Sequence, residues 1–150
     1  MTDKLHEYLN VLLPKCILAY QFIEECLRQC LYRQHTIARK KLEGLLPYNT
    51  PLESINNAAM GKLVLYFRTF NNDDQLISLL NQTKKNRDTI AHQGYLMSYE
   101  EQNDQEFIER KHEELKASLA QAQECLALVH AEMEKLEASV NKLYSNDAGT

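Results

Sequence analysis

The chain has 150 residues and a formal net charge of −4 at pH 7, with only 4 Gly and 3 Pro. This length fits one domain with a single core, and the scarcity of Gly and Pro favours helix over strand. The charge excludes the strongly basic proteins that coat nucleic acid, so any contact with RNA must be local.

Targeting signals and disulfides are not indicated by the sequence. No run of about 18 apolar residues exists that would cross a membrane. The first residues, MTDKLHEYLN, lack the basic and apolar regions of a secretion signal. We therefore expect a cytoplasmic protein without membrane contact. The four cysteines of the chain lie in apolar helical patterns. Reduced, buried thiols are therefore favoured over disulfides at Cys16, Cys26, Cys30 and Cys125.

Both ends of the chain carry heptad repeats, which predict a first helix over 3–32 and a last helix over 103–144. Pro14 should kink the first helix or split off its first turns. The last helix would be roughly 60 Å long, so its end must project, pair with the first helix or pair with another copy. The seam residues are Leu5, Leu9, Leu12, Cys16, Ala19, Ile23, Cys26 and Cys30, then Leu115, Leu119, Ala122, Leu126, Val129, Met133, Leu136, Val140 and Leu143.

Two shorter helices are predicted between these repeats. Thr50 has the character of an N-cap, and Pro51 and Glu53 follow it at the spacing of a helix start. The run NNDD at 71–74 supplies an N-cap for the next helix, and Gly94 is expected to end that helix. The apolar face of the first would consist of Met60, Leu63, Val64, Phe67 and Phe70.

These elements predict an all-α fold: a four-helix-core bundle with long first and last helices and short connecting helices. We expect a single domain over residues 1–150, of which 145–150 form a flexible tail.

One cluster of metal-ligand types is present, but its pattern argues against a metal. Cys26, Cys30 and His35 lack the CxxC spacing of zinc sites, and both cysteines occupy seam positions. No glycine-rich phosphate loop or nucleophile elbow appears. We therefore predict neither a metal nor a cofactor.

The stretch KKNRDTIAHQGY, residues 84–95, places polar chemistry at the end of a predicted helix. On a straight helix Asp88 and His92 share a face, so Asp88 could orient the His92 ring. Arg87 falls on the core-facing stripe and needs an acidic partner or an opening to solvent. About 140° separates Arg87 from His92 around the axis, so a bent last turn or a second protomer is needed to bring them together.

The hexapeptide RDTIAH, after AAMGKLVLYF and before QGY, resembles the Arg-polar-x-x-x-His motif of HEPN domains, especially those of bacterial toxin and defence systems. The resemblance implies a helical domain that homodimerises and brings two motifs into one cleft. Many such proteins are metal-independent endoribonucleases with an antitoxin or other protein partner.

Carried onto this chain, the resemblance gives each motif residue a role. Arg87 would stabilise the scissile phosphate, and His92 would act as general base or acid on the 2′-hydroxyl or the leaving oxygen. Asp88 would orient the site. The neighbouring Lys84 and Lys85 form a basic pair expected to bind RNA. Some HEPN toxins have a modified tyrosine two residues after the histidine, whereas Tyr95 stands three residues after.

A second interpretation is a non-catalytic helical interaction or nucleotide-binding module. The two heptad repeats would then form the working surface, and residues 100–150 carry 12 Asp+Glu against 5 Lys+Arg. Arg87 would pair with an acidic residue across the bundle, and His92 would interact with the helix C-terminus.

Overall fold

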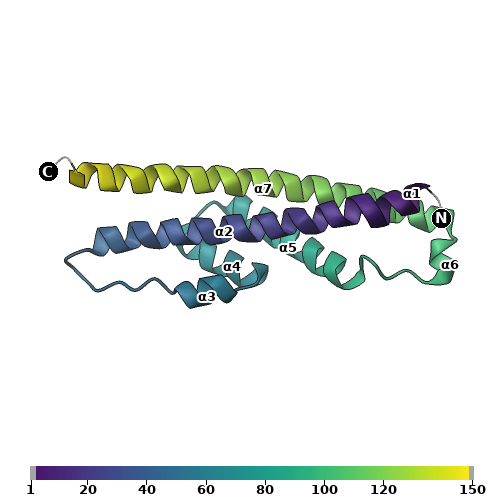
Figure 1. Cartoon of the computed structure of the whole chain (residues 1–150), viewed down its shortest axis with the longest axis horizontal. Helices are drawn as coiled ribbons and strands as arrows, with labels where there is room; N and C mark the ends of the chain where they lie inside the picture. Colours follow the sequence, from purple (N-terminus) through teal and green to yellow (C-terminus); the bar gives the residue numbers. More distant parts are fainter. Residues whose placement is uncertain (1–2, 149–150) are drawn as a thin grey trace.

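A computed structural model describes residues 3–148, of which 147 and 148 are described by their backbone alone. The described residues form helices and connecting segments and contain no strand, so the predicted all-α bundle is confirmed (Figure 1). The elements are α1 (Asp3–Glu7), the π-helical η1 (Tyr8–Leu12), α2 (Leu13–Leu42), α3 (Leu52–Asn57), α4 (Met60–Phe67), the 3-10 helix η2 (Arg68–Phe70), α5 (Asp74–Gln93), α6 (Tyr99–Gln102) and α7 (Gln105–Ala148). No helix in this described part is both long and apolar enough to cross a membrane.

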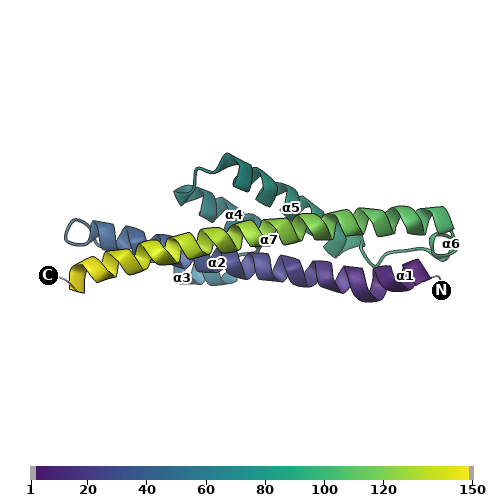
Figure 2. The ribbon, with the colours of Figure 1, turned by 90° about the horizontal axis from the view of Figure 1, so that it is seen from above.

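The two longest helices, α2 and α7, lie side by side and run in the same direction (Figures 1 and 2). All the predicted seam residues are buried or partly buried. The first long helix continues past its predicted end at residue 32, so Arg33 reaches Glu137 and Lys40 lies 5.3 Å from the Tyr144 ring. The far end of α7 therefore pairs with the first helix of the same chain.

Pro14 does not split the first helix. The turn before it, Tyr8–Leu12, is wound as a π-helix, and α2 begins at Leu13 without a break. A wider turn relieves the clash that a proline ring makes with the carbonyl four residues earlier, here that of Asn10. The distortion expected at Pro14 is therefore a local change from α-helical to π-helical winding.

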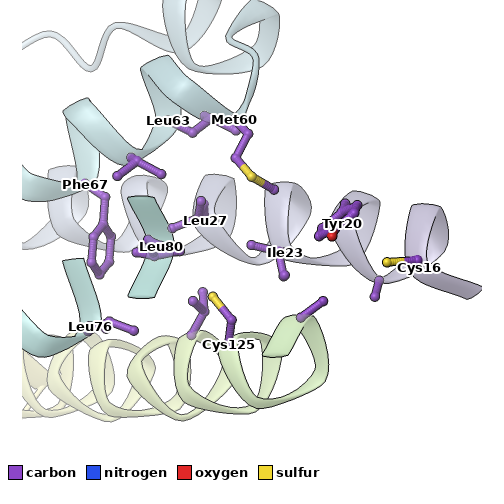
Figure 3. Packing of buried hydrophobic residues seen from close by; sticks show 14 of the residues in the cluster. Cys16, Tyr20, Ile23, Leu27, Met60, Leu63, Phe67, Leu76, Leu80 and Cys125 are labelled. Atoms are coloured by element: carbon purple, nitrogen blue, oxygen red, sulfur yellow. The ribbon is translucent and has the colours of Figure 1, made fainter. Parts of the chain in front are cut away.

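The shorter helices α4 and α5 pack on one side of the α2–α7 pair (Figure 2). Phe67 of α4, Leu27 of α2 and Leu80 of α5 are fully buried where these helices meet (Figure 3). The predicted apolar face of α4 is confirmed through Phe67, but Phe70 is 47% exposed. The α-helix ends at Phe67, and the 3-10 turn that follows rotates Phe70 off the buried face.

The helix ends confirm some predictions and correct others. The Asp73 carboxylate caps α5 by accepting the Leu76 amide at 3.1 Å, as predicted. Thr50 does not cap α3, because that helix begins at Leu52, whose amide already donates to the Thr50 carbonyl. Residues 145–148 of the expected tail belong to helix α7, and 149–150 lie outside the described residues.

Gly94 ends α5 as predicted, but its backbone is right-handed, with φ −59°. A Cβ at this position would lie 2.6 Å from the Ile90 carbonyl oxygen and 2.9 Å from Leu13 Cδ1. The Tyr8 hydroxyl also donates to the Gly94 carbonyl at 2.8 Å. Glycine is therefore required because a side chain would collide with the Ile90 carbonyl of the same helix end and with Leu13 of the first long helix, and not because of φ.

We expect Gly94→Ala to lower the free energy of unfolding by about 1–3 kcal/mol, because backbone and a packed leucine must move to admit the methyl group. Urea denaturation followed by circular dichroism would measure this loss. Gly61→Ala is the control, since its Cβ would meet only the flexible Lys84 side chain, at 3.0 Å. We expect that control to stay within about 0.5 kcal/mol of the native protein. Equal losses in the two variants would contradict the packing argument.

Candidate active site

The C-terminal half of α5 carries the RDTIAH motif on a well-anchored helix. Leu80 and Thr83 are fully buried, and the Thr83 hydroxyl donates to the Leu79 carbonyl at 2.7 Å. One turn after Thr83, on the same face of the helix, the Asn86 amide donates a hydrogen bond to the Gln121 side chain of α7. A bent last turn was one of the two ways in which Arg87 and His92 were expected to come together. That bend is absent, because α5 is α-helical through Gln93.

Arg87 has both the acidic partner and the opening to solvent that its core-facing position requires. Its Nη2 lies 3.4 Å from Glu24 Oε1 on α2, and its Nη1 lies 3.1 Å from Asp88 Oδ1. The side chain remains 35% exposed, whereas that of Glu24 is 17% exposed. Glu24 is the member of this group that sequence reasoning missed.

Lys84 extends the same set of charges along α5. Its Nζ lies 3.5 Å from Asp88 Oδ2, one helical turn away, and its chain passes over Gly61 of α4. Glu24, Arg87, Asp88 and Lys84 therefore form a cluster of alternating charge, which we call the Arg87 cluster. Lys85 is exposed and has no ion pair within the described range.

His92 stands apart from the Arg87 cluster. It is exposed in the last turn of α5 and has no hydrogen bond or ion pair with any residue that the structure describes. Asp88 does not orient its ring, because the Asp88 carboxylate contacts Arg87 and Lys84 instead. On this unbent helix the separation of about 140° between Arg87 and His92 persists. One chain thus presents the two groups on different faces.

A hollow of about 370 Å³ lies beside the same helix end, between α5, η1 and α7. Asn86, Thr89 and Gln93 line it from α5, Tyr8 from η1 and Lys111 from α7. Lys111 Nζ is 3.5 Å from Glu114, which also lines the hollow. Since Arg87 faces Glu24 on α2, this hollow is on another side of α5 from the Arg87 cluster.

Metal-ligating residue types do not gather in the described part of the chain, where no group of three His, Cys, Asp or Glu could hold an ion. His35 Nδ1 is hydrogen-bonded to the Tyr48 hydroxyl, and Cys30 Sγ lies 3.8 Å from the Val129 carbonyl. Burial raises the pKa of Cys30 to about 12 and that of Cys125 to about 11. These thiols therefore stay protonated at neutral pH and are poor nucleophiles.

Comparisons with family models, with characterised proteins and with solved structures give no match to this chain.

The ion pair between Arg87 and Glu24 should contribute little to stability, because both charges keep access to solvent. We expect a double-mutant cycle of Arg87→Ala and Glu24→Gln to give a coupling of about 0.5 kcal/mol in urea denaturation. Glu25→Gln is a matched control on the same helix: the Glu25 carboxylate pairs with Arg28, as that of Glu24 also does, but only Glu24 pairs with Arg87. A coupling above about 2 kcal/mol would show that the Arg87 cluster is a buried structural network.

Proposed function

We propose that this protein is a metal-independent endoribonuclease of the HEPN type, acting in the cytoplasm in a toxin–antitoxin or phage-defence context. One observation carries the proposal. A guanidinium that is one-third exposed and a histidine that is exposed and unpaired within the described residues occur at the same helix end. These are the cation and the proton-transfer group that RNA cleavage requires.

The chemistry uses a nucleophile that RNA itself supplies. His92 takes the proton of a ribose 2′-hydroxyl, whose oxygen attacks the adjacent phosphorus. The 5′-oxygen of the next nucleotide leaves and takes a proton from water, which gives a 2′,3′-cyclic phosphate and a 5′-hydroxyl. Arg87 stabilises the negative charge that develops on the phosphorane oxygens. Histidine is the side chain most often used for such proton transfer.

The proposed site is composite, with Arg87 from one protomer and His92 from its partner. The reason is geometric: about 140° of helix rotation keeps the two side chains of one chain from a common phosphate. Lys84 and Lys85 would attract the RNA backbone beside Arg87. An incoming phosphate must then compete with Glu24 and Asp88 for the guanidinium, since both carboxylates contact it in the free protein.

The test is incubation of the purified protein with single-stranded RNA of mixed sequence in EDTA. The proposal expects cleavage to products with 2′,3′-cyclic phosphate ends, and no cleavage of DNA of the same sequence, which lacks the 2′-hydroxyl. Intact RNA after incubation with a dimeric preparation would contradict it.

A second candidate is the non-catalytic interaction module, and a specific observation favours it. Val11, Leu18 and Phe22 are 39%, 48% and 51% exposed at helical spacing along the first long helix. On this view the carboxylates that neutralise Arg87 are its permanent structural partners, and the apolar residues bind an antitoxin or another protein. A stable complex with such a partner, without RNA turnover, would favour this candidate.

A further inference from the structure

A second candidate site lies at the opposite end of the molecule from α6. The loop of residues 43–51 and helix α3 lie beside the C-terminal part of α2 (Figure 1). There a hollow of about 370 Å³ is lined by four rings from separate segments: His35 of α2, Tyr48 of the loop, Tyr66 of α4 and Phe70 of η2. The remaining lining residues are Pro51, Ser54, Ile55 and Thr69, so no charged carboxylate or amine lines this hollow.

Three of the rings are held in a fixed arrangement. The centroids of His35 and Phe70 are 5.4 Å apart with their planes at 87°, and those of His35 and Tyr48 are 5.8 Å apart. A hydrogen bond between His35 Nδ1 and the Tyr48 hydroxyl fixes the imidazole. Burial lowers the pKa of His35, so the ring is neutral at pH 7. The 47% exposure of Phe70 leaves one aromatic wall open to an incoming ring.

A polar hollow of about 340 Å³ adjoins the aromatic one, and Tyr48 lines both. Its lining includes Arg39, Asn49, Thr36 and Thr50. The Thr36 hydroxyl already donates to the Tyr32 carbonyl at 2.8 Å. No Asp or Glu among the described side chains lines either hollow, so a bound cation would find no counter-charge there. An anion would find the guanidinium of Arg39 and neutral donors in the Asn49 amide and the Thr50 hydroxyl.

We propose that the two hollows form one binding site for a small ligand that joins a planar aromatic ring to an anionic group. The ring would lie among His35, Tyr66 and Phe70, and the anion would bind Arg39. The combined size is that of ordinary small-molecule sites, in which apolar walls surround a few placed polar groups. A nucleoside monophosphate and an aromatic carboxylate share this chemistry.

This site is separate from the RDTIAH motif. Arg39 stands fifteen residues after Glu24, which contacts Arg87, and this is a distance of roughly 22 Å along the axis of α2. The inference therefore does not rest on ribonuclease activity. Binding at the aromatic site and RNA cleavage can each be present or absent without the other.

The chain contains no tryptophan, so the fluorescence of an indole probe, excited at wavelengths that tyrosine does not absorb, can be followed without a background from the protein. We expect indole-3-acetate to bind saturably. We also expect AMP, GMP, CMP or UMP to displace it competitively. Tighter binding of a nucleotide would identify a nucleotide as the ligand, and tighter binding of indole-3-acetate would identify an aromatic carboxylate. Either result would support the site. Indole and acetate, which each lack one half of the ligand, should bind at least about tenfold more weakly.

Two pairs of variants test whether binding occurs at these hollows. Phe70→Ala should weaken binding of the probe by about tenfold or more, because ring stacking is lost. Phe22→Ala, at an equally exposed phenylalanine of α2, should leave it unchanged. Arg39→Ala should weaken binding of the anionic probe but not of indole. Lys41→Ala, which removes the same charge two residues further along α2, should weaken neither.

Three results would contradict the proposal. No saturable binding of any of these probes up to about 1 mM would overturn the proposal. Binding that survives both Phe70→Ala and Arg39→Ala would overturn it as well, as would equal losses in the two controls. Circular dichroism would establish that each variant is folded as the native chain is.

Discussion

Replacing His92 with alanine is expected to lower the rate of RNA cleavage by about 10²–10⁴-fold, because general acid–base catalysis supplies that much of a typical rate. Arg87→Ala should lower it by about 10²–10³-fold, the usual effect of removing a charge-stabilising donor at the reacting group. Neither change should unfold the protein, since His92 is exposed and Arg87 keeps contact with solvent. The measurement is the initial rate on single-stranded RNA in EDTA.

Two matched controls separate a site effect from a general loss of positive charge. His130→Ala removes an exposed histidine of α7 that pairs with Glu134, and Arg110→Ala removes an arginine that lies 5.3 Å from the Phe107 ring. Both should cleave RNA at the native rate. Native rates in His92→Ala and Arg87→Ala would refute the ribonuclease proposal, and equal losses in all four variants would point to non-specific RNA binding.

Replacing Phe67 with alanine is expected to cost about 3–5 kcal/mol of unfolding free energy, the usual range for a buried phenylalanine. Phe67 is fully buried between α2, α4 and α5, with Leu27 and Leu80 near it (Figure 3). The methyl group that remains cannot fill the space of the ring, and well-packed neighbours collapse only partly into it.

Phe22→Ala makes the same chemical change at a ring that is 51% exposed, and it should cost less than about 1 kcal/mol. Urea denaturation of the two variants measures the difference directly. Similar midpoints would mean that the α2–α4–α5 junction is not the core on which the fold depends.

Local patterns in the sequence were sufficient for the four main helices α2, α4, α5 and α7 and for several of their ends, but not for the separate short helices α3 and α6. The heptad seams identified α2 and α7, and the NNDD run at 71–74 identified the start of α5. Residues 33–42 lack that clean repeat, and contacts with the far end of α7 hold them helical. The π-helical turn before Pro14 and the rotation of Phe70 away from the buried face likewise depend on how the helices pack together.

The candidate site was predictable only in part, for the same reason. The spacing of Arg87, Asp88 and His92 gave their angular positions on a helix, and the intact α5 has those positions. The Arg87 cluster also contains Glu24 and Lys84. The contact of Arg87 with Glu24 joins helices distant in the sequence, so no local pattern indicates it. The Asp88 carboxylate contacts Arg87 and Lys84 and does not reach His92.

We propose that Arg87 and His92 act together only across two protomers. A complementation experiment mixes inactive Arg87→Ala and His92→Ala proteins, unfolds and refolds them together, and measures RNA cleavage in EDTA. A mixed dimer would hold one site with both native groups, so the proposal predicts that mixing restores a substantial part of the native rate. Mixed dimers that form, as shown by mass spectrometry of tagged chains, but cleave no faster than either parent would contradict it.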